Sequence, residues 1–152
     1  MSGIARLTED VFVNSGTIFP DSGGTLTLGS LALNPADPAS NTLGSLVRIG
    51  INSSSAPSVV AVTGPASLAG TLEIDLDPNA QPWSYKILTS SGITGTFDSV
   101  TFGGATPNYS LSYLPEGAPT YVQSDLKVPT PTPTPTHTTT GVALVETYQL
   151  DN

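Results

Sequence analysis

Apolar and polar residues alternate in short runs along most of this sequence. The alternation is clearest at two sets of apolar positions, Val47, Ile49 and Ile51 in one run and Leu72, Ile74 and Leu76 in another. An extended strand points successive side chains to opposite faces. Each run therefore predicts a strand with one face on a core and the other in water.

Runs of this kind recur along the chain, and helical periodicity is hard to find between them. They span residues 25–34, 45–52, 58–64, 67–77, 84–90, 94–102, 109–115 and 120–126. The 15 glycines and 14 prolines fall mostly between the runs, where they supply turn geometry. The sequence predicts an all-β fold. Turn signals about every 8–15 residues fit either a β-sandwich or a β-solenoid, and composition does not separate the two.

The sequence changes character after residue 127. We expect an all-β domain over residues 1–127, a Pro/Thr linker over 128–140 and a terminal strand over 141–152. Alternating Pro and Thr favours extended polyproline II, because proline fixes φ and lacks an amide donor. At ~3.1 Å per residue, the 12 residues from 129 to 140 reach about 37 Å.

The terminal strand needs a partner, because an isolated strand is not stable in water. One of its faces carries Val142, Leu144, Tyr148 and Leu150, with Glu146 as the interruption, and the other carries Ala143, Val145, Thr147 and Gln149. It can fold back onto its own domain or join an open sheet edge of a neighbouring subunit. We favour the neighbour, because a foldback is usually served by a tight turn. The predicted assembly residues are Val142, Leu144, Val145, Tyr148 and Leu150.

The charge balance disfavours some classes of binding partner. Four Lys and Arg against 12 Asp and Glu give a net charge of −8, which disfavours nucleic acid and anionic membrane surfaces. No apolar stretch approaches the ~20 residues of a membrane helix, so we expect no membrane insertion. Only 11% of residues are charged, against about 25% in typical soluble domains. A surface of Ser, Thr, Asn and Gly is common in secreted β proteins.

Three acidic residues form the one candidate metal site. Glu73, Asp75 and Asp77 alternate onto one strand face within about 14 Å, and clustered carboxylates suit Ca²⁺. The simpler interpretation is a solvated strand face, and we expect no metal or cofactor. Asp75 with Glu73 or Asp98 offers a carboxylate pair of the kind that glycosidases use, but nothing in the spacing requires one. We therefore predict no enzyme.

Aromatic residues offer a glycan platform as the alternative to structural packing. They are Trp83, Tyr85, Tyr109, Tyr113 and Tyr121. We favour packing, as cross-strand pairs or as a cap over the last coil. The single histidine, His137, lies in the Pro/Thr linker without an orienting partner nearby in sequence, so we assign it no catalytic role.

Three motifs between about residues 58 and 126 resemble a known family. They read "LAGTLEIDLDP", "YKILTSSGITGTFDSVTF" and "YSLSYLPEGAPTYVQSDL". Together they resemble the C-terminal coils of autotransporter-type passenger domains, which are right-handed β-solenoids on bacterial surfaces. The resemblance implies a solenoid, an extracellular or bacterial cell-surface location and no enzymatic activity.

These observations lead to two hypotheses. The first is a non-enzymatic structural subunit of an extracellular fibre, which binds copies of itself head to tail through the terminal strand, since donation without closure generates a filament. The second is a surface-displayed, adhesin-like binding module for glycans or Ca²⁺.

The first hypothesis predicts the effect of a charge on the apolar face of the terminal strand. Leu144→Asp is expected to abolish assembly and leave the domain of residues 1–127 folded, because burial of a large apolar side chain contributes roughly 1.5–3 kcal/mol. Electron microscopy and circular dichroism check the two parts. Intact filaments from this variant would count heavily against strand donation.

Overall fold

The computed structural model describes residues 4–6, 10–13, 16–52, 56–103 and 108–127, with side chains from residue 16 onward. These residues form fourteen strands and no helix. No helix in the described part of the chain is therefore long and apolar enough to cross a membrane. The predicted linker and the five predicted assembly residues of the terminal strand lie outside the described residues.

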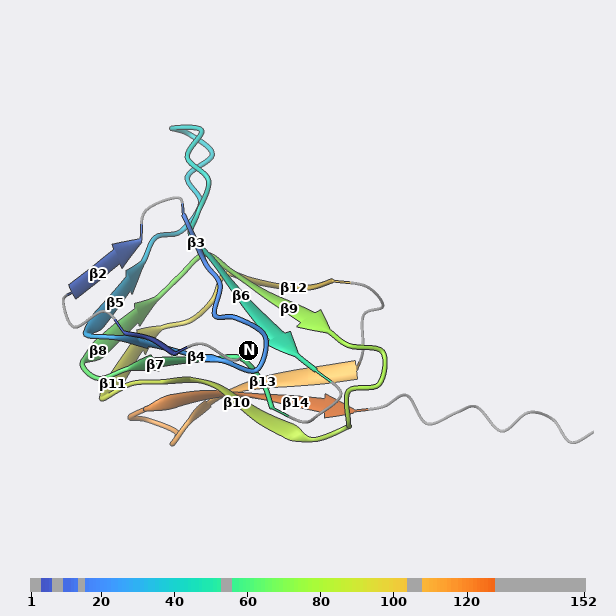
Figure 1. Ribbon diagram of the computed structural model, residues 1–152. Coiled ribbons are helices and arrows are strands. Elements are labelled where there is room, and N and C mark those ends of the chain that lie inside the picture. Colours follow the sequence, from blue (N-terminus) through green and yellow to red (C-terminus); the bar gives the residue numbers. More distant parts are fainter. Residues whose placement is uncertain (1–3, 7–9, 14–15, 53–55, 104–107, 128–152) are drawn as a thin grey trace, which may run out of the picture.

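The strands make three sheets (Figure 1). The first sheet runs in the order β1 (Ile4–Arg6), β4 (Thr25–Leu28), β7 (Val59–Val62), β10 (Ser84–Thr89), β14 (Tyr121–Lys127) and β13 (Asn108–Leu114). The second contains β11 (Gly92–Gly95), β8 (Pro65–Leu68), β5 (Ser30–Leu33) and β2 (Asp10–Val13). The third contains β12 (Ser99–Gly103), β9 (Thr71–Leu76), β6 (Leu46–Ile51) and β3 (Thr17–Ile18).

The chain visits the three sheets in rotation and returns to the first sheet at β4, β7 and β10. Strands of successive coils pair in parallel in every sheet. The protein is therefore a β-solenoid of about three turns. This confirms the all-β prediction and decides between the two architectures that the sequence left open.

The core fills the space between the three sheets. The predicted inward positions are confirmed: Val47, Ile49, Ile51, Leu72 and Ile74 are buried and Leu76 is half-buried. Strand pairing stacks like residues in columns, for example Ile18, Val47, Leu72 and Val100 across the third sheet. Each coil thus buries its apolar side chains against those of the next coil.

Some runs that the sequence presents as single strands are divided by a corner of the solenoid. The runs 25–34 and 67–77 each contribute to two strands, and so does 94–102. Gly70 and Gly95 lie at such corners with φ of 72° and 70°, a left-handed conformation that favours glycine. A Cβ at Gly70 would also collide with the carbonyl oxygen of Ser45 in the preceding coil. The coils therefore stack backbone on backbone at this corner.

An antiparallel hairpin ends the parallel stack. β14 pairs with β10 in antiparallel fashion, and β13 pairs with β14 over all seven of its residues. β13 is consequently the outermost strand of the first sheet. A second departure from the coil is the excursion of residues 34–44 between β5 and β6, which projects away from the solenoid at the top of Figure 1.

The close stacking at the corner predicts a strong substitution effect. Gly70→Ala is expected to lower the free energy of unfolding by about 1–3 kcal/mol or more, because a left-handed φ and a backbone collision both oppose the methyl group. Gly92→Ala is the matched control, since no atom lies within 4 Å of its added Cβ. Urea unfolding measures both. Equal stabilities for the two variants would contradict this account of the corner.

Candidate functional site: the C-terminal end of the solenoid

β13 is a sheet edge with which no other described strand pairs on its outer side. Its seven residues, Asn108–Leu114, contain no charged residue and no proline. Its register with β14 runs without interruption, so no bulge bends the edge away. Natural proteins usually protect exposed edges with charges, proline or bulges, because an open row of N–H and C=O groups accepts another strand. β13 lacks all three of these protections.

The neighbouring edge of the second sheet is better protected. β11 has four residues, and the amide of Ile93 donates to the carbonyl oxygen of Pro119 at 2.8 Å. Gly95, at the end of β11, has the left-handed φ of 70° noted above. The loop that connects β13 to β14 thus covers the start of β11. This leaves β13 as the longer and more regular edge of the two.

The side of β13 that faces the solenoid carries Tyr109, Leu111 and Tyr113, which pair in register with the buried residues of β14. The rings of Tyr109 and Phe102 lie 4.6 Å apart between centroids and are tilted by 58°. Leu111 and Tyr113 pack against the core. The aromatics thus act as a cap over the last coil, the alternative that the sequence analysis favours.

Tyr113 also makes a polar contact with the last coil. Its hydroxyl oxygen accepts a hydrogen bond from the amide of Phe97 at 3.0 Å. Burial raises the pKa of Tyr113, and the bond from Phe97 lowers it by less. The hydroxyl therefore stays protonated at neutral pH. This bond fixes the position of β13 relative to the segment between β11 and β12.

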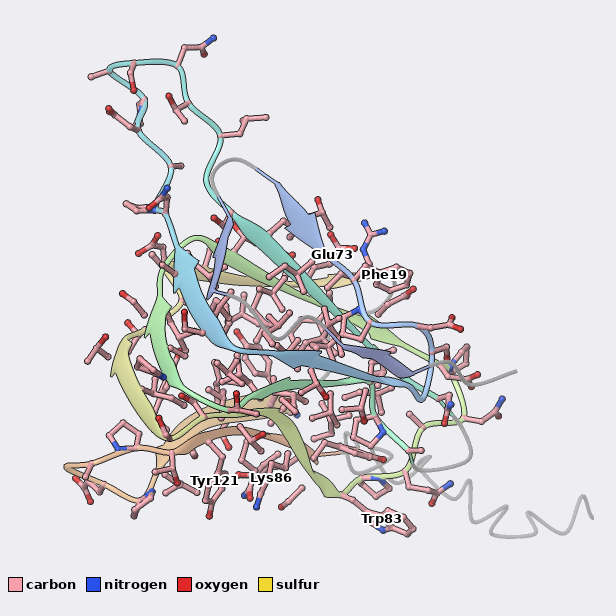
Figure 2. The ribbon with its side chains drawn as sticks, turned by 60° about the vertical axis from the view of Figure 1, so that its left-hand side comes forward. Phe19, Glu73, Trp83, Lys86 and Tyr121 are labelled. Atoms are coloured by element: carbon pink, nitrogen blue, oxygen red, sulfur yellow. The ribbon has the colours of Figure 1, made fainter. Side chains whose placement is uncertain are left out.

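The remaining aromatics lie on other parts of the molecule. Tyr85 is buried and its hydroxyl donates to the carbonyl oxygen of Gln81 at 2.7 Å, while burial raises its pKa. The Lys86 ammonium lies 4.1 Å from the centroid of the Tyr121 ring, and the two side chains appear together in Figure 2. Trp83 is 54% exposed. The five aromatics of the sequence analysis therefore do not form one platform.

The three acidic residues of the candidate calcium site have different surroundings. Glu73 Oε1 lies 2.7 Å from Arg48 Nε, whose N–H is not aligned for a hydrogen bond, so the contact is an ion pair. Asp77 Oδ1 accepts a bond from the amide of Asn79 at 2.8 Å. Asp75 is exposed, and its carboxylate makes no hydrogen bond or ion pair with the described residues. Within the described ranges, no three His, Asp or Glu side chains are grouped to hold a metal ion.

Asp98 has a structural role at a corner. Its Oδ2 accepts a hydrogen bond from the amide of Gly70 at 2.6 Å. This bond joins the turn before β12 to the corner between β8 and β9. The Asp98 carboxylate therefore holds two coils together, and this role does not involve Asp75. His137 lies outside the described residues.

Sequence reasoning did not identify β13 as an edge. The signal was present, because the run from Asn108 to Leu114 contains no charge or proline, but edge position depends on the order of strands in the sheet. It also gave no role to Phe19, whose side chain is 52% exposed beside the outer face of the third sheet. A lone aromatic after a two-residue strand gives no periodic signal.

Comparison with protein-family models found no match, and comparison with curated proteins found no relative of significant similarity. The structure supports one part of the resemblance to passenger-domain coils, the β-solenoid architecture.

The bond between Tyr113 and Phe97 predicts a difference between two tyrosines of the same strand. Tyr113→Phe is expected to lower the free energy of unfolding by about 1–3 kcal/mol, because the amide of Phe97 loses its acceptor. Tyr109→Phe is expected to change it by less than about 0.5 kcal/mol, since the Tyr109 hydroxyl bonds to no described residue. Chemical denaturation checks both. Equal costs would mean that the Tyr113 hydroxyl does not hold the cap.

Proposed function

We propose that this protein is a non-enzymatic structural subunit of an extracellular fibre. The terminal strand, residues 141–150, would add to β13 of a neighbouring subunit, and repetition of this contact would build the fibre. The observation that carries the proposal is the uncharged, regular and proline-free edge of β13. An edge of this kind is a template for main-chain pairing.

The side chains on the two strands support this pairing. Tyr109, Leu111 and Tyr113 form the apolar face of β13, and Tyr109 is still 37% exposed. A strand paired with β13 places its own side chains beside these residues on the same face. The apolar face of the terminal strand, from Val142 to Leu150, would extend the cap. Its opposite face would lie beside Ser110 and Ser112.

The point where the chain leaves the solenoid also supports donation to a neighbour. β14 ends at Lys127, which pairs with Asn108 at the start of β13. The seven residues of β13 span about 23 Å at ~3.3 Å per residue. The linker reach of about 37 Å is greater than this length. A stiff spacer of that reach would be long enough to carry the terminal strand beyond its own edge.

The fibre would be extracellular and at a bacterial cell surface. The low share of charged residues and the resemblance of residues 58–126 to autotransporter-type passenger coils support this location. The solenoid architecture agrees with that resemblance. Net charge −8 disfavours nucleic acid as a partner, because nucleic acid is itself negatively charged.

A separate feature favours the second candidate function, a surface-displayed binding module. It is a hollow on the outer side of the third sheet, described in the next subsection. β13 belongs to the first sheet, so one molecule can serve both functions.

Disulfide trapping tests the pairing, because these 152 residues contain no cysteine to interfere. We expect Ser112→Cys in one full-length chain to crosslink, after mixing and oxidation, with at least one of Ala143→Cys, Val145→Cys and Thr147→Cys in another. Paired strands bring Cβ atoms to within about 5 Å, close to the distance that a disulfide needs. Non-reducing gels and mass spectrometry of the linked peptides identify the chains that are joined.

The matched control is Ala61→Cys, on the outer face of β7 within the same sheet. Equal crosslinking of Ala61→Cys would mean random collision. A single chain that carries Ser112→Cys together with one of the three terminal-strand cysteines tests the foldback. A bond within single chains, with none between chains, would overturn the fibre proposal.

A further inference from the structure

A hollow of about 310 Å³ lies at the side of the third sheet. It is lined by Phe19, Ser22, Gly50, Ile51, Asn52, Asp75, Leu76, Asp77 and Pro78. Its volume is at the lower end of the roughly 300–1,000 Å³ of small-molecule sites. The lining combines an aromatic ring, two carboxylates and bare backbone, so the hollow has both apolar and polar walls.

The strand register explains why part of the wall of the hollow is backbone without side chains. Asp75 in β9 pairs with Gly50 in β6 on one side and with Gly103 in β12 on the other. The Asp75 carboxylate therefore stands between two positions that lack side chains. Gly103 is explained by this carboxylate, because a Cβ at Gly103 would lie 2.9 Å from Asp75 Oδ1.

Gly50 has no such explanation. Its φ is not in the left-handed region. The nearest atom to a Cβ at Gly50 is Ser58 Oγ at 3.4 Å, an ordinary contact. Glycine weakens a strand interior and often marks a place where a ligand approaches the backbone. Neither conformation nor a backbone collision requires glycine here. Gly50 and Ser22 both line the hollow, so a methyl group at Gly50 would become part of its wall.

Phe19 supplies the aromatic wall. The Arg48 guanidinium lies 5.6 Å from the centroid of its ring, and Glu73 pairs with the same guanidinium. Figure 2 shows Phe19 and Glu73 close together, far from Trp83, Lys86 and Tyr121. Arg48 and Glu73 neutralise each other, so the local charge at the hollow comes from Asp75 and Asp77. These charges disfavour anionic ligands.

We propose that this hollow binds a neutral saccharide. The apolar face of a pyranose ring would pack against Phe19, over the backbone at Gly50. Its hydroxyl groups would donate to the Asp75 carboxylate, which has no partner among the described residues, and to Asp77. Hydrogen bonds to an ionised acceptor are stronger than neutral ones, which suits a shallow site that stays partly wet.

The test uses the full-length protein and a printed array of neutral oligosaccharides, followed by a nuclear magnetic resonance titration with the oligosaccharide that binds best. Phe19→Ala is expected to weaken binding about tenfold or more, the effect of losing a well-packed aromatic contact. Gly50→Ala is expected to weaken binding to a similar extent with no loss of thermal stability. Trp83→Ala, which removes a similarly exposed aromatic side chain far from the hollow, is expected to leave affinity unchanged.

Three results would overturn the proposal. They are the absence of binding to every neutral oligosaccharide, the loss of binding in Trp83→Ala with retention in Phe19→Ala, and the loss of binding when Ca²⁺ is removed with EDTA. The proposal does not depend on the fibre function. A chain that fails to form filaments but binds through Phe19 would retain the saccharide site and reject only the fibre.

Discussion

Main-chain hydrogen bonding between successive coils is the constraint on which the rest of this structure depends. A single coil leaves the backbone groups of its strands and its inward side chains without partners, so it is stable only when stacked. Stacking in register requires the corners to match, and Gly70 meets this need with its backbone against Ser45. The same requirement creates the problem of the last coil, whose edges have no further coil to pair with.

The edges of the last coil are protected to different extents. The first sheet is extended by two antiparallel strands, and their loop covers the start of β11. Tyr113 and Leu111 then close the apolar interior from the end. Each added strand has an outer edge of its own, however, so the hairpin moves the open edge from β10 to β13.

The sequence predicted the strands and their inward faces well, because alternation is a local property of the chain. Val47 and Ile74 face the core as expected. Alternation is the same in a sandwich and a solenoid, so the choice between them depended on which strands pair, which is not local. Corners inside the runs were missed for a related reason: the strands break at Ala69 and Gly70, but Leu68, Gly70 and Leu72 are all buried, so the alternation continues across the corner.

The candidate sites were harder to predict, since they depend on register between strands that are distant in sequence. Glu73 looked like a metal ligand on its own strand, but register places it opposite Arg48 of the preceding coil. Asp75, two residues later, meets Gly50 and stays free of described partners. The difference between these two acids arises in the neighbouring strand and has no signature in their own run.

The excursion between β5 and β6 has a consequence for the evolution and engineering of this solenoid. Its neck is closed by the amide of Ser45 donating to the carbonyl oxygen of Asn34 at 2.9 Å and the amide of Asn34 donating to Ser45 Oγ at 3.0 Å. The coil thus continues from Asn34 to Ser45 as if residues 35–44 were absent. Leu43, in this excursion, is 79% exposed. Gly44 is constrained, because a Cβ there would lie 2.6 Å from the amide nitrogen of Ala36. The tip of the excursion is tied to no coil, so a peptide epitope or a whole domain inserted there would be displayed without disturbing the ladder.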